Sequence, residues 1–140
     1  MDDYVAIMNL VARFLMEVDQ RDWDAVREMM TDPFHADFSS ITGKPATTST
    51  PEAFTDQWRS LLSAYDATQH QIGNQIVEID GSLAEFRSHV TTSHFRVNGP
   101  EGSTTEFIVG SYRFSLVRTD HGWKLASVVF ARSFETSGFA

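Results

Sequence analysis

The half of the chain that follows Thr68 is rich in strand-forming residues and is interrupted by three short turn sequences. The turns lie at residues 80–82, 98–102 and 120–122, and each combines Asp or Asn with Gly. These residues tolerate the backbone angles of tight turns between antiparallel strands. The spacing therefore predicts four successive strands, over residues 68–79, 83–97, from the second turn to residue 118, and 123–134.

The residues before this region predict helices. Apolar side chains recur at helical spacing over residues 4–19, so we expect one face of that helix to be buried. The expected buried residues are Tyr4, Met8, Val11, Ala12, Leu15 and Val18. A second, short helix follows the capping residue Asp22 and is ended by Pro33. Its expected buried residues are Trp23, Val26, Met29 and Met30.

A strand over residues 34–41 and a polar loop over residues 42–50 come next. Thr50 and Pro51 then form the start of a third helix, which reaches to about residue 66. Helices followed by hairpin-linked strands predict an α+β fold, with three N-terminal helices packed on one face of an antiparallel sheet. The 140 residues fit one domain, residues 1–140.

The composition excludes several classes of function. The formal net charge of −8 repels phosphate backbones, so we expect no nucleic-acid partner. Cysteine is absent, which excludes disulfides and thiolate chemistry. The first residues lack the positive charge of a signal peptide, and no apolar run approaches the ~18 residues that span a bilayer. We expect a cytoplasmic protein without membrane contact.

Sequence motifs for metals and cofactors are also missing. No phosphate-binding glycine loop, dinucleotide fingerprint or nucleophile elbow appears in the chain. The histidines do not show the HxH or HxxxH spacing of many metal sites. We therefore expect neither a metal ion nor a cofactor.

Asp19 is a candidate functional residue because of its position in the first helix. It lies four residues after Leu15 and eight after Val11, on the face that we expect to be buried. A dry, unpaired carboxylate costs several kcal/mol, on the order given for buried charges. Asp19 must then have a partner or lie at an open end of the core; alternatively, the helix frays and Asp19 is a solvated turn residue.

Two histidines are predicted to point inward from the strands. His70 is in phase with Ile72 and Ile76, although Gly73 can mark a bulge that resets the phase. His94 shares a face with Ala84, Phe86, Ser88, Val90 and Thr92, which is the apolar face, whereas His89 lies on the other. A single inward histidine is commonly a core residue, so position alone leaves a structural role open for each.

Tyr112 is predicted to point inward as well, in phase with Ile108, Gly110, Phe114 and Leu116. A buried tyrosine hydroxyl needs a hydrogen-bond partner, which can be purely structural.

Asp19 lies in the motif VDQRDW at residues 18–23 and His70 in the motif TQHQIGN at residues 68–74, and a third motif, DHGWK, occupies residues 120–124. Together these motifs resemble the SnoaL-like branch of the NTF2-like superfamily, and scytalone dehydratases most closely. The resemblance implies a cone-shaped NTF2-like, or cystatin-like, fold. It also implies an Asp–His dyad of Asp19 and His70, and a second catalytic histidine at His94. Two family tyrosines are replaced, by Val18 and Phe38.

The implied chemistry is cofactor-independent proton abstraction next to a carbonyl. His70 would be the base and Asp19 its orienting partner, while His94, with Tyr112, would donate to the enolate or to the leaving group. Loss of water would make the protein a dehydratase. An isomerase or a polyketide cyclase would begin with the same step, and a non-catalytic small-molecule-binding module is a further alternative.

The substrate is expected to be a flat, largely apolar small molecule, such as a polyketide or aromatic intermediate. Candidate wall residues for its site, each of which can equally be ordinary core, are Phe14, Phe34, Phe38, Trp58, Phe86 and Phe114. The last strand carries apolar residues in both phases, with Trp123, Leu125 and Val129 in one phase and Ala126, Val128 and Phe130 in the other. One phase needs cover from a second subunit, so a homo-oligomer is expected, for which the resemblance implies a trimer or a dimer.

Overall fold

A computed structural model describes residues 2–99 and 102–136. It contains the four expected long strands: β3 (Ala67–Asp80), β4 (Leu83–Gly99), β5 (Gly102–Thr119) and β6 (Gly122–Glu135). They pair antiparallel in chain order. Residues 100 and 101 of the second expected turn, and residues 137–140 of the expected domain, lie outside the described residues.

The sheet has six strands in the order β2-β1-β6-β5-β4-β3. Strand β1 (Met30–Asp37) runs parallel to β6, and β2 (Thr47–Ser49) pairs antiparallel with β1. The sheet is therefore mixed, where the sequence predicts an antiparallel one. The expected strand over residues 34–41 is observed as β1, which begins at residue 30 and ends at residue 37. The expected loop over residues 42–50 contains β2, because this segment pairs with β1 and forms the edge of the sheet.

The helices are α1 (Asp3–Gln20), α2 (Trp23–Glu28), α3 (Ser39–Thr42) and α4 (Pro51–Leu62). The predicted caps are confirmed: the Asp22 carboxylate accepts from the Ala25 amide, and the Thr50 hydroxyl accepts from the Ala53 amide, both at 3.1 Å. Helix α2 ends before the residue predicted to stop it, Pro33, because the chain joins β1 from residue 30 onward. Likewise α4 ends at residue 62 and not near residue 66.

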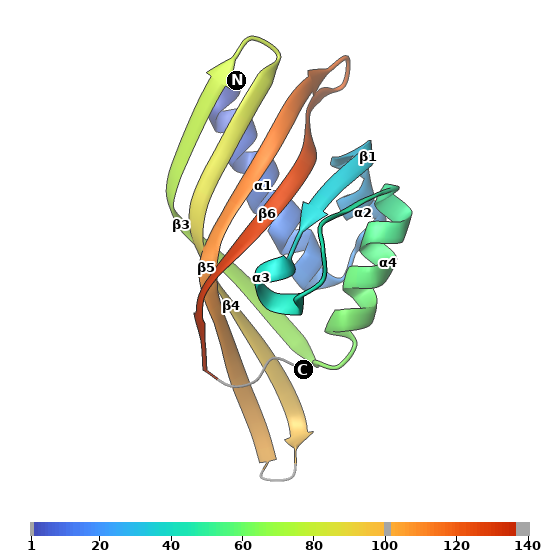
Figure 1. Cartoon of the computed structure of the whole chain (residues 1–140), viewed down its shortest axis with the longest axis vertical. Coiled ribbons are helices and arrows are strands. Elements are labelled where there is room, and N and C mark those ends of the chain that lie inside the picture. Colours follow the sequence, from blue (N-terminus) through green and yellow to red (C-terminus); the bar gives the residue numbers. More distant parts are fainter. Residues whose placement is uncertain (1, 100–101, 137–140) are drawn as a thin grey trace.

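Figure 1 shows how these elements are arranged. Helix α1 lies across one face of the long curved strands, and α2 and α4 lie to one side, next to β1. The short helix α3 lies beside β6, on the side where α4 lies. None of the helices in residues 2–99 and 102–136 is long and apolar enough to cross a membrane.

The buried face of α1 differs from the predicted one. Its buried residues are Ile7, Val11, Phe14, Leu15 and Val18. Tyr4 and Met8 are instead 52% and 38% exposed. Positions 7, 11, 14 and 18 fit the helical period as well as the predicted set does. The large Phe14 ring packs against Phe114 in β5, and this contact accounts for the rotation of the buried face of α1 away from the predicted one.

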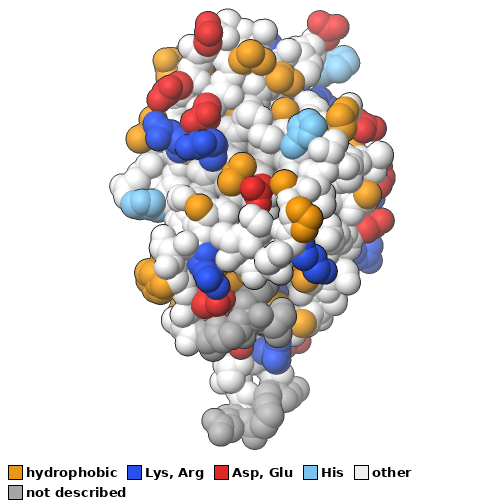
Figure 2. Space-filling view, in the orientation of Figure 1, with side chains coloured by type: hydrophobic (Ala, Val, Ile, Leu, Met, Phe, Trp, Pro, Cys, Tyr) orange, Lys and Arg blue, Asp and Glu red, His pale blue; other side chains and the backbone are white. Residues whose placement is uncertain are grey.

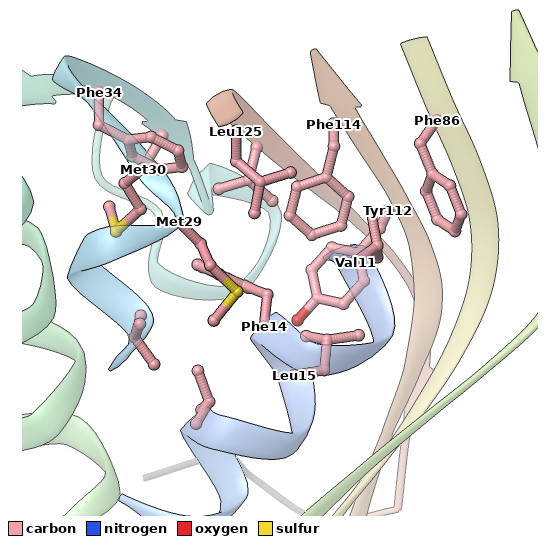
Figure 3. Close-up of a cluster of buried hydrophobic side chains, with 14 of the residues drawn as sticks. Val11, Phe14, Leu15, Met29, Met30, Phe34, Phe86, Tyr112, Phe114 and Leu125 are labelled. Carbon is pink, nitrogen blue, oxygen red and sulfur yellow. The ribbon is translucent and has the colours of Figure 1, made fainter. Parts of the chain in front are cut away.

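The core itself is mainly aromatic and aliphatic. Figure 3 shows side chains from α1, β1 and the long strands converging on one cluster. The largest fully buried side chains include Phe14, Phe34, Phe86 and Phe114. Burial of each such ring stabilises the fold by roughly 1.5–3 kcal/mol.

Two of the irregularities in strand pairing bear on the predicted inward-facing residues. The β3–β4 register shifts between Gly73 and Ile76, and Ile76 is 50% exposed where the strand phase predicts it to be buried. The glycine thus lies at a bulge, as the sequence suggests.

The second irregularity lies between β5 and β6. Ser115 pairs with Ser127 and Leu116 with Leu125, so Ala126 is the extra residue of a bulge. As a result, one continuous face of β6 is buried, formed by Trp123, Leu125, Val128 and Phe130. The bulge changes which residues form the outward phase of β6, in which Val129 is exposed, and the homo-oligomer stays a prediction.

Gly110 allows β5 and β6 to approach next to the cavity described below. A methyl group at this position would overlap the backbone oxygen of Ala131 and the ring of Phe130. Only glycine therefore permits Phe130 to lie where it does.

Candidate active site

A cavity of about 170 Å³ opens between α3, α4 and the inner face of the sheet. Its walls are apolar and include Phe38, Phe54, Trp58, Ile108 and Phe130. An apolar cavity of about 150 Å³ is large enough to hold benzene. The cavity can thus take the ring of a small aromatic or alicyclic molecule.

Buried polar side chains lie on this cavity at its sheet side. They are His70, Thr92, His94 and Tyr112. His70 of β3 pairs with Thr92 of β4, and His94 lies two residues after Thr92, so that it is diagonally opposite His70. Diagonal partners of this kind are roughly 7–8 Å apart, so one small molecule can contact both imidazoles.

Asp19 and His70 form a hydrogen-bonded pair. The Asp19 Oδ1 atom lies 2.7 Å from the Nδ1 atom of His70, whose side chain is only 4% exposed. A carboxylate only accepts hydrogen bonds, so Nδ1 must carry the proton. The other ring nitrogen, Nε2, is then left as an acceptor on a ring that lines the cavity.

The Asp19 carboxylate is held by two further donors. The backbone amide of His70 donates to Oδ2 at 2.9 Å, and the Thr68 hydroxyl donates to Oδ1 at 3.1 Å. Asp19 lies in the last turn of α1, where the helix dipole disfavours a negative charge. These hydrogen bonds offset that effect, and they fix the carboxylate in one orientation.

Arg21 positions the segment around this pair. It adopts the left-handed conformation (φ 63°) directly after α1. Its guanidinium donates to the carbonyl oxygens of Leu62 and Tyr65 at 3.2 and 3.3 Å. The end of α1 is thereby tied to the end of α4, just before β3 begins.

His94 is buried, with 4% of its surface exposed, as its strand phase predicts. The pKa of His94 is lowered to about 4, mainly by burial and next by the neighbouring His70, while Asp19 acts in the opposite direction. The ring of Tyr65 packs against it at 4.7 Å between centroids. At neutral pH His94 is therefore an uncharged imidazole on the cavity wall.

This depressed pKa predicts a pH dependence of folding. The unfolded chain binds a proton at His94 near pH 6.5 and the folded chain only near pH 4, so the free energy of unfolding falls as the pH drops from 6.5 to 4. The free energy of unfolding, measured with urea over this range, should change less steeply with pH in His94→Gln than in the wild type. The variant His89→Gln, at an outward position of the same strand, is the control and should keep the wild-type slope. Equal slopes in all three proteins would contradict the prediction.

Tyr112 lies at the same wall. Burial raises the pKa of its hydroxyl well above the ordinary value of 10, and the charge of Asp19 raises it further. The hydroxyl thus stays protonated and lies within electrostatic range of the dyad. No hydrogen bond joins it to another residue in the described part of the chain, which leaves its proton for a ligand.

The six aromatic residues expected to contact substrate divide into two groups. Phe38 and Trp58 line the cavity. Phe14, Phe34, Phe86 and Phe114 do not; they are at most 1% exposed and belong to the core. Their apolar character alone gives no sign of this difference, because core and cavity walls use the same residue types.

Several cavity and dyad residues are not apparent from the sequence motifs. Thr92, Lys44 and Gln57 line the cavity, and Thr68 binds the dyad carboxylate. Thr68 has the same strand phase as His70, two residues away, and that spacing is the one signal that could identify it. Among residues 2–99 and 102–136, no three histidine, aspartate or glutamate side chains are grouped so as to hold a metal ion.

Comparison with known proteins agrees with this fold. The protein of known structure Kfla4162 from Kribbella flavida is 30% identical, with a TM-score of 0.92 over 97% of this chain and 94% of that one. A proposed scytalone dehydratase from Novosphingobium aromaticivorans is 15% identical, with a TM-score of 0.81 over 95% and 85%. A hexachlorocyclohexane dehydrochlorinase, LinA type 2, is 22% identical, with a TM-score of 0.78 over 95% and 86%.

Further solved neighbours are described as proteins with a cystatin-like fold, one of them as NTF2-like, and this is the α+β architecture seen here. No curated protein sequence matches the chain. The SnoaL-like domain matches residues 1–129, which is nearly the whole sequence. The chain therefore belongs to the SnoaL-like family.

Proposed function

We propose that this protein is a cofactor-independent dehydratase that acts on a small, largely apolar carbonyl compound. The observation that carries the proposal is the 2.7 Å contact between Asp19 Oδ1 and His70 Nδ1, beside an apolar cavity that His70 lines. A module that only binds a ligand does not need a carboxylate to orient a cavity histidine. The dehydratase and dehydrochlorinase among the structural neighbours are consistent with elimination chemistry on this fold.

The first step is removal of a proton. Nε2 of His70 takes the proton from the carbon next to the substrate carbonyl, and the electron pair of that C–H bond moves to the carbonyl oxygen. Asp19 stabilises the resulting imidazolium and holds its Nδ1–H. The neutral His94 donates an N–H to the enolate oxygen, and Tyr112 is placed to donate as well.

The second step breaks the C–O bond at the β carbon. The enolate re-forms the carbonyl, a carbon–carbon double bond forms, and hydroxide departs. Hydroxide takes the proton held by His70 and leaves as water, which returns the enzyme to its starting state. The two positions that carry tyrosine in scytalone dehydratases hold the buried Val18 and the cavity residue Phe38, so neither supplies a donor to this oxygen.

An isomerase is the second candidate. On a substrate with a β,γ double bond the same proton abstraction gives a conjugated dienolate. The proton on His70 then returns to the γ carbon, so that the double bond moves into conjugation with the carbonyl. The absence of hydroxyl donors at Val18 and Phe38 favours this outcome over scytalone-type dehydration. A cyclase would use the same enolate to attack an internal carbonyl.

A product assay tests the dehydratase proposal. The purified protein is incubated with one-ring β-hydroxy ketones, such as 4-hydroxy-4-phenylbutan-2-one, and the conjugated enone is followed by its ultraviolet absorbance. We expect formation of enone above the buffer rate, and its loss in His70→Ala. A protein that leaves these hydroxy ketones unchanged but moves the double bond of a one-ring β,γ-unsaturated ketone into conjugation would instead be the isomerase.

Thr68 is expected to help Asp19 to orient His70. Its hydroxyl donates to the same Asp19 oxygen that binds His70. A hydrogen bond to a charged group contributes about 1.5–3 kcal/mol. Thr68→Val keeps the shape and removes this donor, so kcat should fall about tenfold with little change in KM. Thr68→Ser should restore most of the activity, whereas equal activity of Val and Thr at this position would show that the hydroxyl has no such role.

A further inference from the structure

The opening of the cavity differs in chemistry from its buried end. The lining residues that are exposed to solvent, and so lie at the opening, include Thr42, Lys44, Thr47 and Gln57. At the other end lie the buried polar side chains of His94 and Tyr112, and the walls between the two ends are mainly apolar. A ligand that fills the cavity therefore meets an apolar middle and a polar group at each end.

Lys44 supplies a positive charge at this opening. It is the one Lys, Arg, Asp or Glu among the described residues that line the cavity. No carboxylate of the described residues forms an ion pair with its ammonium group. Lys44 thus places a positive charge at the opening of the cavity on a chain whose net charge is −8.

The backbone holds Lys44 at the opening. Gly43, with a φ of 69°, ends α3 in the left-handed region that favours glycine, and it turns the chain toward β2. The amide of Lys44 donates to the Thr42 hydroxyl at 3.1 Å. On the other side, Thr47 pairs with Ala36 of β1. The segment between Gly43 and Thr47 is thus anchored at both ends. Figure 2 shows acidic and basic side chains interspersed on the face of the molecule that carries this segment.

We propose that Lys44 and Gln57 form a subsite for a carboxylate, and that the substrate is an acid: a one-ring carbonyl compound with an anionic group directed to the opening. The ammonium pairs with the carboxylate, and the Gln57 amide donates a second hydrogen bond. The ring lies between Phe38 and Trp58, and the reacting carbonyl end reaches His70 and His94. This proposal rests on the proposed function in one respect, that the cavity is the substrate site.

Two probes of equal shape test it by binding alone. They are 3-phenylpropanoate and its primary amide, 3-phenylpropanamide, which differ only in the charge of the terminal group. Dissociation constants are measured by calorimetry, with tryptophan fluorescence as a second readout because Trp58 lines the cavity. The proteins are the wild type, Lys44→Gln, Lys44→Arg and Arg59→Gln. Arg59 is exposed on α4 and does not line the cavity, so its variant is a matched loss of one positive charge.

We expect the wild type to prefer the carboxylate, and Lys44→Gln to bind it about tenfold more weakly, in line with a charge-assisted hydrogen bond. Lys44→Arg should retain most of the preference, and added salt should reduce it. The amide should bind all four proteins within about twofold.

Equal binding of the two probes by the wild type would overturn the subsite, as would no binding of either. The same loss in Arg59→Gln as in Lys44→Gln would overturn it too, since the effect would then be general electrostatics. None of these readouts requires turnover, so they are separate from the tests of proton abstraction.

Discussion

Replacement of His70 with alanine should lower the rate of proton abstraction by about 10²–10⁴-fold, the range of general-base catalysis. The substitution removes the Nε2 acceptor on the cavity wall and leaves the apolar walls in place. The loss should therefore appear in kcat, with KM changed little. Steady-state kinetics on any substrate identified by the product assay provide the measurement.

The fold should survive this change. The backbone amide of residue 70 and the Thr68 hydroxyl still donate to Asp19 in the variant, so the carboxylate keeps two of its three partners. The ring contact with Trp58 is lost, at a cost of about 0.5–1.5 kcal/mol beyond the buried area. His89→Ala, on the outward face of β4, is the matched control and should keep full activity. A collapse of folding in His70→Ala alone would point to a structural role for His70.

Replacement of Asp19 with asparagine should lower kcat by about 10³–10⁴-fold, the effect expected when the partner of a catalytic histidine loses its charge. The amide is the same size, but its NH₂ group can donate to Nδ1 of His70. That arrangement favours the tautomer with the proton on Nε2, which cannot take a proton from substrate. The imidazolium formed in the reaction also loses its counter-charge at 2.7 Å.

Stability and activity should separate in this variant. Asparagine at the end of α1 removes an unfavourable interaction with the helix dipole, worth about 0.3–1 kcal/mol, which offsets part of the lost hydrogen bonding. The melting temperature of this variant should then lie close to that of the wild type. Activity within a few-fold of the wild type would show that the carboxylate does not orient the base.

The inward positions of His94 and Tyr112 could be predicted from the sequence, because side chains alternate along a strand and apolar neighbours mark the buried face. The caps at Asp22 and Thr50 were predictable for a similarly local reason: each side chain binds a backbone amide three residues away. The pairing of Asp19 with His70, 51 residues apart, is a tertiary contact. It was predicted from resemblance to a family, because the position of each residue alone left other roles open.

Other features depend on long-range packing that local patterns do not encode. The bulge at Ala126 resets the phase of β6 through its pairing with β5, and so changes which residues form its outward face. Phe38 lines the cavity and Phe34 is buried in the core, although both belong to the same predicted strand. The difference arises because the chain leaves β1 after residue 37 and turns into α3 over the cavity.

The dyad constrains the first chemical step more than the later ones. An oriented base beside an apolar cavity favours removal of a proton and stabilisation of the enolate by His94. Loss of water, return of the proton elsewhere and ring closure all begin from that enolate. The polar groups at the opening of the cavity, Lys44 and Gln57 among them, are proposed to select which molecule is bound.

Deuterium exchange tests the first step directly. One-ring ketones without a leaving group, such as 4-phenylbutan-2-one, are incubated in D₂O with the wild type, His70→Ala and Asp19→Asn, and the signal of the protons next to the carbonyl is followed by NMR. We predict that the wild type speeds this exchange well above the buffer rate and that both variants return it to within a few-fold of buffer. Exchange at the wild-type rate in His70→Ala would contradict the assignment of His70 as the base.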